Sequence, residues 1–283
     1  MTVTSHSDYV LISDTEYFDL DKTLDCGQCF RFERMEDGGW QGVALGRRLR
    51  MYQSEKGICI YGITKSQFEN EGFYDYFDLG RNYGEINRVL YSDPVLRPMI
   101  SEGSGIRILR QPPFETLVSF IISTSNNIPR IKQIIDRLCK QFGRRAQDGF
   151  GEYYTFPDCG TLSELGLDQL AAIRAGYRDK YILDCAKKVA GGEVDLKAVK
   201  QMEYPDAVKE LTKIKGVGVK VADCVLLFAY GKLCAFPRDV WIKRALEKLY
   251  PDDGGKALMQ SQYAGIAQQY MYFWARNNHI TTL

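Results

Sequence analysis

The stretch Leu211–Asp239 reads LTKIKGVGVKVADCVLLFAYGKLCAFPRD and predicts two helices joined by a glycine hairpin, followed by a loop that ends in a carboxylate. Apolar residues recur at helical spacing on both sides of the hairpin, and Gly231 is a stop signal for the second helix. The apolar positions are Val208, Leu211 and Ile214 before the hairpin and Val221, Val225 and Phe228 after it. The pattern therefore predicts a helix-hairpin-helix.

The hairpin GVGVK places Gly216 and Gly218 directly before the second predicted helix. Backbone N–H groups at a helix start have no partner within the helix, and a missing side chain lets a phosphate oxygen approach them. Such a hairpin binds a nucleic-acid backbone without reading its sequence. A bare GxG is more often a plain corner between two helices. Lys220, Pro237 and Asp239 near the hairpin favour the functional interpretation.

The composition predicts a soluble protein with one large domain or two smaller ones, because the 283 residues are 45% hydrophobic. No apolar run reaches the length of a membrane span. The first ten residues, MTVTSHSDYV, have neither a signal-peptide core nor a transit-peptide pattern. We expect no membrane association and a cytoplasmic, nucleoid-associated protein of a bacterium.

The overall charge does not indicate a nucleic-acid binder, since 37 Lys and Arg against 36 Asp and Glu give a net charge of +1. A DNA-binding surface must therefore be local. Lysines near the hairpin form one candidate patch, although a lysine-rich helix is also typical of a solvated face. The residues of this hairpin patch are Lys209, Lys213, Lys215 and Lys220, with Glu210 as the one opposing charge.

The eight cysteines are irregularly spaced, which is typical of free thiols in a cytosolic protein. Cys26 and Cys29 form the motif CGQC, which alone fits a redox pair or half a zinc site. No second CxxC follows, and the only histidines are His6 and His279. We therefore expect no metal site built from side chains.

The two parts of the chain differ in pattern. Residues 9–62 contain five β-rich segments separated by turn signals, which predict an antiparallel meander: YVLIS, CFRFERM, WQGVAL, RRLRMYQ and GICIYG. Residues 66–100 and the chain from Gly105 onward have helical patterns. We predict an α+β protein with an N-terminal antiparallel sheet domain and flanking helices over 1–106, then an all-α domain over 107–283.

Several helices are expected in the second domain. PFETLVSFIISTS predicts a buried helix, and Asn126 and Asn127 precede another helix that has Pro129 in its first turn and Gly143 as its stop. A helical pair over 167–189 is broken at Gly176. The segment YAGIAQQYMYFWARNNHI, residues 263–280, predicts a final helix.

Together these segments resemble the base-excision DNA glycosylases of the helix-hairpin-helix superfamily, most closely the lysine-bearing, bifunctional 8-oxoguanine branch. The motifs in the family's order are DCGQCFRF, YFDL, GIRILRQPPFETLVSFIISTSNNIPRI, AGYRDKYI, GVGVKVADCVLLFA and YAGIAQ. They cover nearly the whole chain. The resemblance implies a DNA N-glycosylase and DNA-(apurinic or apyrimidinic site) lyase that flips 8-oxoguanine out of duplex DNA and removes it.

The resemblance assigns the chemistry to Lys220 and Asp239. Lys220 would attack C1′ of the sugar as a neutral amine and form a Schiff base, which leads to β-elimination. Asp239 would stabilise the cation-like sugar, and it could also cap a helix that begins near Val240. An exposed lysine and a plain helix cap are the structural alternatives.

The resemblance also implies a base pocket. The carbonyl of Gly27, in the GQ motif, would accept a hydrogen bond from N7–H of 8-oxoguanine and repel the N7 acceptor of guanine. Cys224 and Tyr272 would sandwich the purine, with Tyr272 where relatives have Phe. Gln268 would read the Watson–Crick edge. A turn glycine, a buried cysteine and a helical tyrosine are also ordinary core features.

Other positions are implied to probe the DNA. Asn127 would fill the void left by the base, or Asn126 would do so, because the asparagine run is one residue shorter than in relatives. Tyr177 would act as a wedge, and Arg130 and Arg178 would contact the cytosine left behind. Taken singly, these residue types are also typical of helix caps, cores and solvated surfaces.

Phosphate contacts are implied for Gly216, Gly218 and Val219 at the hairpin. Two nearby positions depart from the family pattern. Arg238 stands where relatives have a small or apolar residue, and Trp241 stands where they have a phosphate-contacting histidine. Arg238 either replaces that phosphate contact or perturbs its neighbour, the catalytic carboxylate.

The resemblance implies no required cofactor beyond a monovalent or divalent cation held by backbone carbonyls of the hairpin. The four-cysteine cluster that some glycosylases carry after the catalytic Asp is absent from the sequence, so we expect no iron–sulfur cluster. The expected partner is double-stranded DNA with an oxidised purine, bound by a monomer. Two alternatives stay open: a glycosylase for another damaged purine, and a non-catalytic DNA-binding module.

Overall fold

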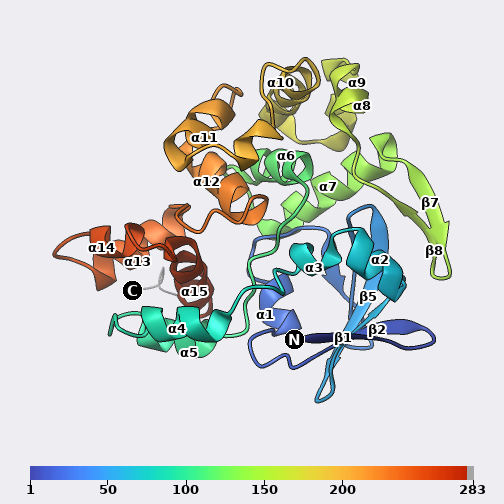
Figure 1. The fold of residues 1–283 in the computed structure, drawn as a ribbon. Coiled ribbons are helices and arrows are strands. Elements are labelled where there is room, and N and C mark those ends of the chain that lie inside the picture. The colour runs from blue at the N-terminus through green and yellow to red at the C-terminus, as the bar shows by residue number, and fades with distance from the viewer. Residues whose placement is uncertain (279–283) are drawn as a thin grey trace.

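The computed structural model describes residues 1–278 and shows a sheet followed by helices, which confirms the α+β prediction (Figure 1). The antiparallel sheet has the strand order β1-β2-β6-β5-β4-β3. Its strands are β1 (Thr2–Ser5), β2 (Tyr9–Ser13), β3 (Phe32–Arg34), β4 (Trp40–Ala44), β5 (Arg47–Ser54) and β6 (Gly57–Tyr61). The edge strand β1 was not predicted, because TVTS has no buried face of its own and forms by pairing with β2.

One face of the sheet is buried. Ile12, Met51 and Ile60 from β2, β5 and β6 are fully buried there, as period-two alternation requires. Phe68 and Phe73 pack on the same cluster from the two short helices that follow the sheet. The helices that accompany the sheet are α1 (Leu20–Leu24), α2 (Lys65–Asn70) and α3 (Phe73–Tyr76).

The remainder of the chain is mainly helical. In Figure 1, α8–α10 lie at the top and the sheet lies at the lower right, with α6, α7 and α12 between them. The helices are α4 (Tyr83–Leu90), α5 (Arg97–Gly103), α6 (Pro113–Ser123), α7 (Ile128–Phe142), α8 (Cys159–Ser163), α9 (Leu167–Leu170), α10 (Asp179–Ala190), α11 (Tyr204–Leu211), α12 (Val219–Phe228), α13 (Val240–Leu249), α14 (Lys256–Met259) and α15 (Ala264–Asn277). The last two residues of the helix predicted over 263–280 lie outside the described residues.

The second part of the chain is not all-α, since it also contains a hairpin of β7 (Arg145–Asp148) and β8 (Gly151–Tyr154). Its short, mostly polar strands give no clear periodic signal. The hairpin is held from outside by the buried Arg48 of β5, which pairs with Asp148 and donates to the Gly151 carbonyl at 2.6 Å. A tertiary contact thus stabilises strands that local sequence does not predict.

The domain boundary predicted after residue 106 remains a prediction. The hydrophobic core of the helical part, however, already includes residues that precede it. Met99 and Ile100 of α5 belong to the core of the helical part. The Tyr270 hydroxyl of α15 donates to Asn87 Oδ1 of α4 at 2.9 Å. Helices α4 and α5 therefore pack with the C-terminal helices rather than with the sheet.

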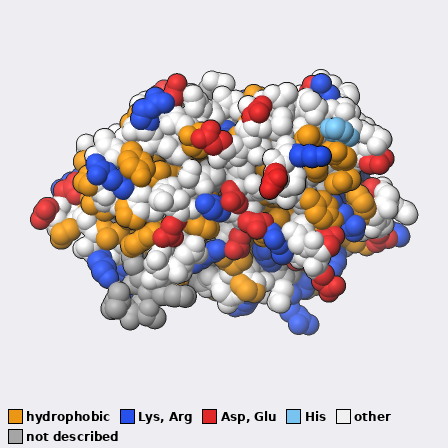
Figure 2. All heavy atoms as spheres, turned by 90° about the horizontal axis from the view of Figure 1, so that it is seen from below, with side chains coloured by type: hydrophobic (Ala, Val, Ile, Leu, Met, Phe, Trp, Pro, Cys, Tyr) orange, Lys and Arg blue, Asp and Glu red, His pale blue; other side chains and the backbone are white. Residues whose placement is uncertain are grey.

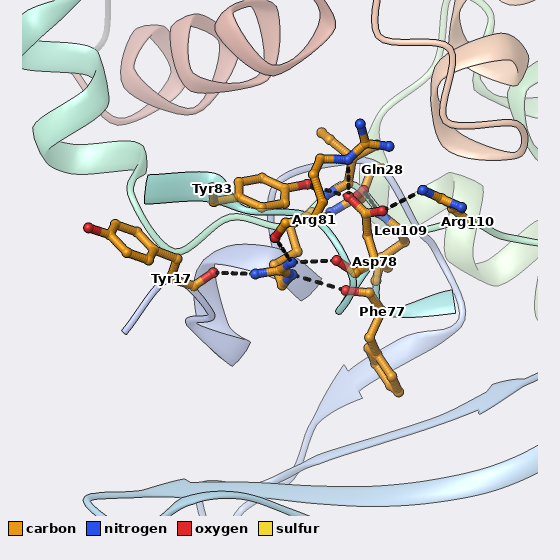
Figure 3. Close-up of polar contacts among 10 residues, drawn as sticks. Tyr17, Gln28, Phe77, Asp78, Arg81, Tyr83, Leu109 and Arg110 are labelled. Atoms are coloured by element: carbon orange, nitrogen blue, oxygen red, sulfur yellow. Dashed lines mark hydrogen bonds and ion pairs between the residues drawn. The ribbon is translucent and has the colours of Figure 1, made fainter. Parts of the chain in front are cut away.

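A buried polar network ties the junction between the two parts together, with Asp78, Arg81, Tyr83 and Arg110 among its members (Figure 3). Arg107 is only 1% exposed, and its guanidinium donates to the carbonyls of Tyr17, Phe77, Asp78 and Arg81. The buried Asp78 carboxylate in turn accepts from Arg81, Tyr83 and Arg110. A buried charge is costly unless it is hydrogen-bonded, and the Arg107 guanidinium and the Asp78 carboxylate meet that requirement, although Arg110 Nε at the edge of the network has no partner within residues 1–278.

The face seen in Figure 2, from below Figure 1, has acidic and basic side chains interspersed and offers no continuous basic surface. All eight cysteines are free thiols, as their spacing predicts. Within residues 1–278, no group of three or more His, Cys, Asp or Glu side chains could hold a metal ion. No helix in that range is long and apolar enough to cross a membrane.

Candidate active site

A cavity of about 750 Å³ lies where α12, α13, α15, the α6–α7 turn and the loop around Gly27 meet. Most of the residues predicted for the site line it, although they come from distant parts of the chain. These are Gly27, Asn127, Gly216, Gly218, Lys220, Cys224, Arg238, Asp239, Trp241, Gln268 and Tyr272. The predicted residues Arg130, Tyr177, Arg178 and Val219 are not part of this lining.

Lys220 lies on the first turn of α12 and is half-buried, so it is not a plain surface lysine. Its ammonium lies 5.5 Å from the centre of the Phe120 ring. One turn further along the helix, burial raises the pKa of the Cys224 thiol to about 11, while the Lys220 ammonium acts in the opposite direction. The thiol therefore stays protonated beside the amine at neutral pH.

Asp239 is at the same time a helix cap and part of the cavity wall. Its Oδ1 accepts from the Ile242 N–H at 2.9 Å and caps α13. Burial raises the pKa of the Asp239 carboxyl, while the Ile242 N–H and the Lys220 ammonium oppose that rise. The two roles considered from the sequence are therefore compatible.

The hairpin presents unpaired backbone donors. Gly216 has a φ of 82°, and a Cβ at that position would lie 2.6 Å from the Tyr181 ring, so a glycine is required. A Cβ at Gly218 would meet only open space. No side chain caps the N-terminus of α12, and Val219 is 54% exposed. The first N–H groups of α12 are thus available to an anion.

Gly27 lies against Tyr272. It has a φ of 76°, and a Cβ there would come within 3.1 Å of the Tyr272 hydroxyl oxygen. Any side chain would therefore strain the backbone and crowd the Tyr272 ring, which would have to shift by a few tenths of an ångström. Burial, with the nearby Asp239, raises the pKa of the Tyr272 phenol to about 12, so the phenol is neutral at physiological pH.

Gln268 is the clearest sign that the cavity takes a polar ligand. The side chain is 4% exposed, and its Oε1 has no hydrogen-bond partner among residues 1–278. An unsatisfied buried acceptor costs about 1–3 kcal/mol. A hydrogen-bond donor on a molecule inside the cavity would remove that cost.

The α6–α7 turn differs in detail from the sequence-based expectation. Asn127 caps α7, with its Oδ1 accepting from the Arg130 N–H at 3.0 Å. Asn126 donates to the Ile122 carbonyl at 3.0 Å, so both asparagines are tied to the backbone. The exposed residue with left-handed backbone at the apex is Ser125, with a φ of 46°. Sequence reasoning missed Ser125, although the shortened asparagine run was the signal.

Arg178 is placed differently from the prediction. It is 3% exposed, and its guanidinium donates to the carbonyls of Thr124, Ser125 and Ala175. It also stacks on the Tyr177 ring, with 4.4 Å from Cζ to the ring centre. The guanidinium therefore holds the α6–α7 turn beside the exposed Tyr177, and it is not free to reach a base in this arrangement.

Two of the predicted DNA-probing residues are exposed outside the cavity. Tyr177 is 52% exposed, which is unusual for a large aromatic side chain. Arg130, in the first turn of α7, makes no side-chain hydrogen bond or ion pair within the described chain. Both are available to a macromolecule that covers the mouth of the cavity.

The rim of the cavity carries positive charge. Arg238 is exposed and Trp241 is half-buried at the start of α13. Lys243, one turn further, is exposed, lines the cavity and was not singled out from the sequence. In the hairpin patch, by contrast, Lys213 pairs with Glu210 at 2.6 Å.

Two family models match the chain in succession. Residues 10–117 match "8-oxoguanine DNA glycosylase, N-terminal domain", and residues 118–264 match "HhH-GPD superfamily base excision DNA repair protein". The N-glycosylase/DNA lyase OGG1 of Arabidopsis thaliana is 29% identical over 263 residues, which span 88% of this chain and 71% of that protein.

Solved structures agree over nearly the full length. The structure of MBOgg1 in complex with a low-affinity DNA ligand is 39% identical, with a TM-score of 0.94, and covers 98% of this chain and 99% of that one. The Clostridium acetobutylicum 8-oxoguanine glycosylase/lyase, in complex with duplex DNA containing cytosine opposite 8-oxoG, is 37% identical, with a TM-score of 0.93 and 99% coverage of both chains. This chain belongs to the HhH-GPD superfamily of base excision DNA repair proteins, in the branch with an 8-oxoguanine DNA glycosylase N-terminal domain.

Proposed function

We propose that this protein is a bifunctional 8-oxoguanine DNA glycosylase and DNA-(apurinic or apyrimidinic site) lyase acting on duplex DNA. The observation that carries the proposal is the meeting of half-buried Lys220, the partly buried Asp239 carboxyl and the unsatisfied Oε1 of Gln268 in one cavity. An amine, a carboxylate and a base-reading amide suit glycosidic cleavage with a covalent intermediate.

A base must leave the duplex to reach this cavity. The α12 N-terminus and the rim residues Arg238 and Lys243 bind backbone phosphates and fix the register of the DNA. The exposed Tyr177 wedges into the stack, and the turn that Arg178 holds fills the space left by the base. Extrusion costs a few kcal/mol, which these contacts offset.

Lys220 and Asp239 then cleave the glycosidic bond. After the Lys220 ammonium has released a proton, the lone pair of Nζ forms a bond to C1′, and the C1′–N9 bond breaks with its electron pair leaving on the base, which takes up a proton. Asp239, whose carboxyl is partly buried, stabilises the positive charge that develops on the sugar. Ring opening gives the Schiff base, and loss of a proton from C2′ expels the 3′ phosphate.

The pocket distinguishes the lesion at N7. The Gly27 carbonyl accepts from the N7–H of 8-oxoguanine, whereas guanine would place an acceptor against it. Cys224 and Tyr272 enclose the ring faces, and Gln268 pairs with the Watson–Crick edge. A mispaired buried polar group costs more than a loss of apolar fit, so this contact discriminates strongly.

We assign preference for cytosine in the opposite strand to Arg130. Its guanidinium is a donor only, and orphaned cytosine offers O2 and N3 acceptors, whereas adenine offers an amino donor. Arg178 contributes indirectly, through the turn that it holds.

We also propose that the protein is a cytoplasmic monomer that needs no cofactor. Backbone carbonyls of the hairpin would hold a monovalent or divalent cation beside the bound phosphate. The Lys213 carbonyl already accepts from Lys188 Nζ at 2.6 Å and the Ile214 carbonyl accepts from the Val217 N–H, so the remaining carbonyls of the turn would supply the ligands. Lesion affinity in potassium, in a bulky organic cation and after chelation tests the need for the ion.

Strand cleavage of duplexes with one 8-oxoguanine opposite each of the four bases tests the function. We expect cleavage at the lesion, fastest opposite cytosine. Release of a formamidopyrimidine or alkylated purine with no activity on 8-oxoguanine would instead show a glycosylase for another damaged purine. Binding without any cleavage would show a DNA-binding module.

A further inference from the structure

The two peptide groups on either side of the Gly27–Gln28 peptide, namely Cys26–Gly27 and Gln28–Cys29, are each held by a buried glutamine. The Cys26 carbonyl accepts from Gln269 Nε2 at 2.6 Å, and the Gln28 carbonyl accepts from Gln111 Nε2 at 2.7 Å. Gln269 is 2% exposed and Gln111 is 7% exposed. The chain is thus fixed immediately before and after the glycine whose carbonyl is proposed to read the lesion.

Gln28 itself is fully buried and fully bonded. Its Nε2 donates to the carbonyls of Thr23 at 2.9 Å and Arg107 at 2.8 Å, and its Oε1 accepts from the Leu109 N–H at 2.9 Å. Figure 3 shows Gln28 beside Leu109 in the buried network at the junction. The segment after Gly27 is therefore anchored to the buried stretch that carries Arg107 and Leu109.

These bonds also connect Gly27 to the catalytic helices. Gln269 follows Gln268 on α15, and the Gln111 N–H donates to the Phe228 carbonyl at the end of α12, the helix of Lys220. The Gln28 side chain also bonds back across Gly27, since its Nε2 donates to the Cys26 sulfur at 3.3 Å. Within residues 1–278, no hydrogen bond reaches the Gly27 carbonyl itself.

A glycine at this position needs such restraint because it has wide backbone freedom. Rotation of the peptide between Gly27 and Gln28 would replace the carbonyl with the Gln28 N–H on the cavity side. An N–H there would pair with N7 of guanine, whereas the carbonyl pairs with N7–H of 8-oxoguanine. The orientation of one peptide would thus reverse the preference of the pocket.

We propose that Gln269 and Gln111 are positioning residues that hold the Gly27 peptide with its carbonyl toward the cavity and thereby set the discrimination between 8-oxoguanine and guanine. The inference rests on the proposed function. An apolar core would not need these amides, and burying them is costly unless each is paired. Their partners are the two carbonyls whose directions fix the backbone on either side of Gly27.

The test measures affinity by fluorescence anisotropy in a Lys220→Gln background, which lacks the attacking amine and should still bind the lesion. Three duplexes are compared: one with 8-oxoguanine opposite cytosine, one with guanine opposite cytosine, and one with a tetrahydrofuran abasic analogue. We expect Gln269→Met and Gln111→Met each to lower the ratio of 8-oxoguanine to guanine affinity at least tenfold, about the value of one polar contact. Affinity for the abasic analogue, which has no base to read, should be unchanged.

Asn87→Leu is the matched control. It removes another buried amide that bonds α15, through the Tyr270 hydroxyl, without touching the Gly27 loop. This variant should lose stability and keep the affinity ratio. A ratio that falls equally in the control would show general loosening of the fold and overturn the proposal.

If the methionine variant does not fold, Gln269→Glu replaces it in the test, because glutamic acid keeps the shape of the side chain. A protonated glutamic acid donates to the Cys26 carbonyl, and an ionised one cannot, so the affinity ratio should fall as pH rises through the pKa of the buried acid. A ratio independent of pH and equal to that of the parent would contradict the proposal. A parent protein with no preference for 8-oxoguanine would instead contradict the proposed function.

Discussion

Asp239, the N-cap of α13, and Lys220, in the first turn of α12, line the same cavity. Burial raises the pKa of the Asp239 carboxyl, while the Lys220 ammonium lowers it. Burial has the larger effect, so the net pKa of Asp239 is above its usual value of 3.8. When ionised, the carboxylate lies in a poorly solvated position, where its charge acts strongly on a nearby cation.

Asp239→Asn should slow base excision at least about a hundredfold, the scale of a lost preorganised electrostatic contact. Asparagine caps helices as well as aspartate does, so α13 and the melting temperature should change little. Single-turnover rates on 8-oxoguanine opposite cytosine measure the effect. An unchanged rate would leave Asp239 with the capping role alone.

The raised pKa of Asp239 also fixes the sign of two pH dependences. Excision should fall as pH drops through the raised pKa, because the carboxylate is lost. Stability should move the other way: the folded state binds this proton before the unfolded chain does, so the burial penalty is full above the folded pKa and is relieved as pH falls toward 3.8. Urea unfolding of the parent protein and of Asp239→Asn across this pH range isolates the contribution of Asp239 to the free energy of unfolding.

Gln268→Met should stabilise the free protein by about 1 kcal/mol and weaken lesion binding at least tenfold. The substitution removes a buried acceptor that has no partner in residues 1–278, but it also removes the group that reads the base. Denaturant unfolding and anisotropy with an 8-oxoguanine duplex measure the two effects. Loss of stability together with unchanged affinity would show that Gln268 is a core residue only.

Substitutions of Arg130 and Arg178 should have different effects on excision and on stability. Arg130→Ala should narrow the difference between excision opposite cytosine and opposite adenine, which we expect to be at least tenfold, chiefly by slowing the cytosine case. Arg178→Met should cost about 2 kcal/mol of stability, because it leaves the carbonyls of the α6–α7 turn without their donor, and should slow excision opposite every base alike. If Arg178→Met alone erased the opposite-base preference, the assignment to Arg130 would be wrong.

Lys243→Ala should reduce the slope of log affinity against log salt by about one, since an exposed lysine at the cavity rim releases about one counterion on phosphate contact. Lys213→Ala should change the slope less, because Glu210 already pairs with Lys213. Titrations at several salt concentrations measure both slopes. Equal slopes for Lys243→Ala and the parent protein would show that Lys243 does not contact a DNA phosphate.

The sequence predicted the elements whose signals are local. The helix-hairpin-helix was readable from GVGVK and its flanking apolar faces, and α7 was readable from the cap at Asn127 and from Pro129. Lys220 and Asp239 could be placed in one site only through the resemblance to a family, because nineteen residues of sequence separation do not determine a distance in space.

What the sequence did not predict depends on tertiary contacts. The β7–β8 hairpin requires Arg48 from the sheet, and the buried position of Arg178 requires the carbonyls of Thr124 and Ser125. Gln111 and Gln269 were overlooked because a glutamine gives no local signal of burial. The one sequence feature that could have indicated their burial is that each is a polar residue inside or beside an apolar run.

Trapping of the covalent intermediate tests the central claim most directly. The protein is mixed with a labelled duplex that carries 8-oxoguanine opposite cytosine, in the presence of borohydride, and the adduct is digested to locate the attached lysine. We predict a stable protein–DNA adduct at Lys220, and no adduct with Lys220→Gln, which should still bind the lesion because the hairpin backbone is unchanged. An adduct formed in full yield by Lys220→Gln, or at another lysine of the parent protein, would contradict the account.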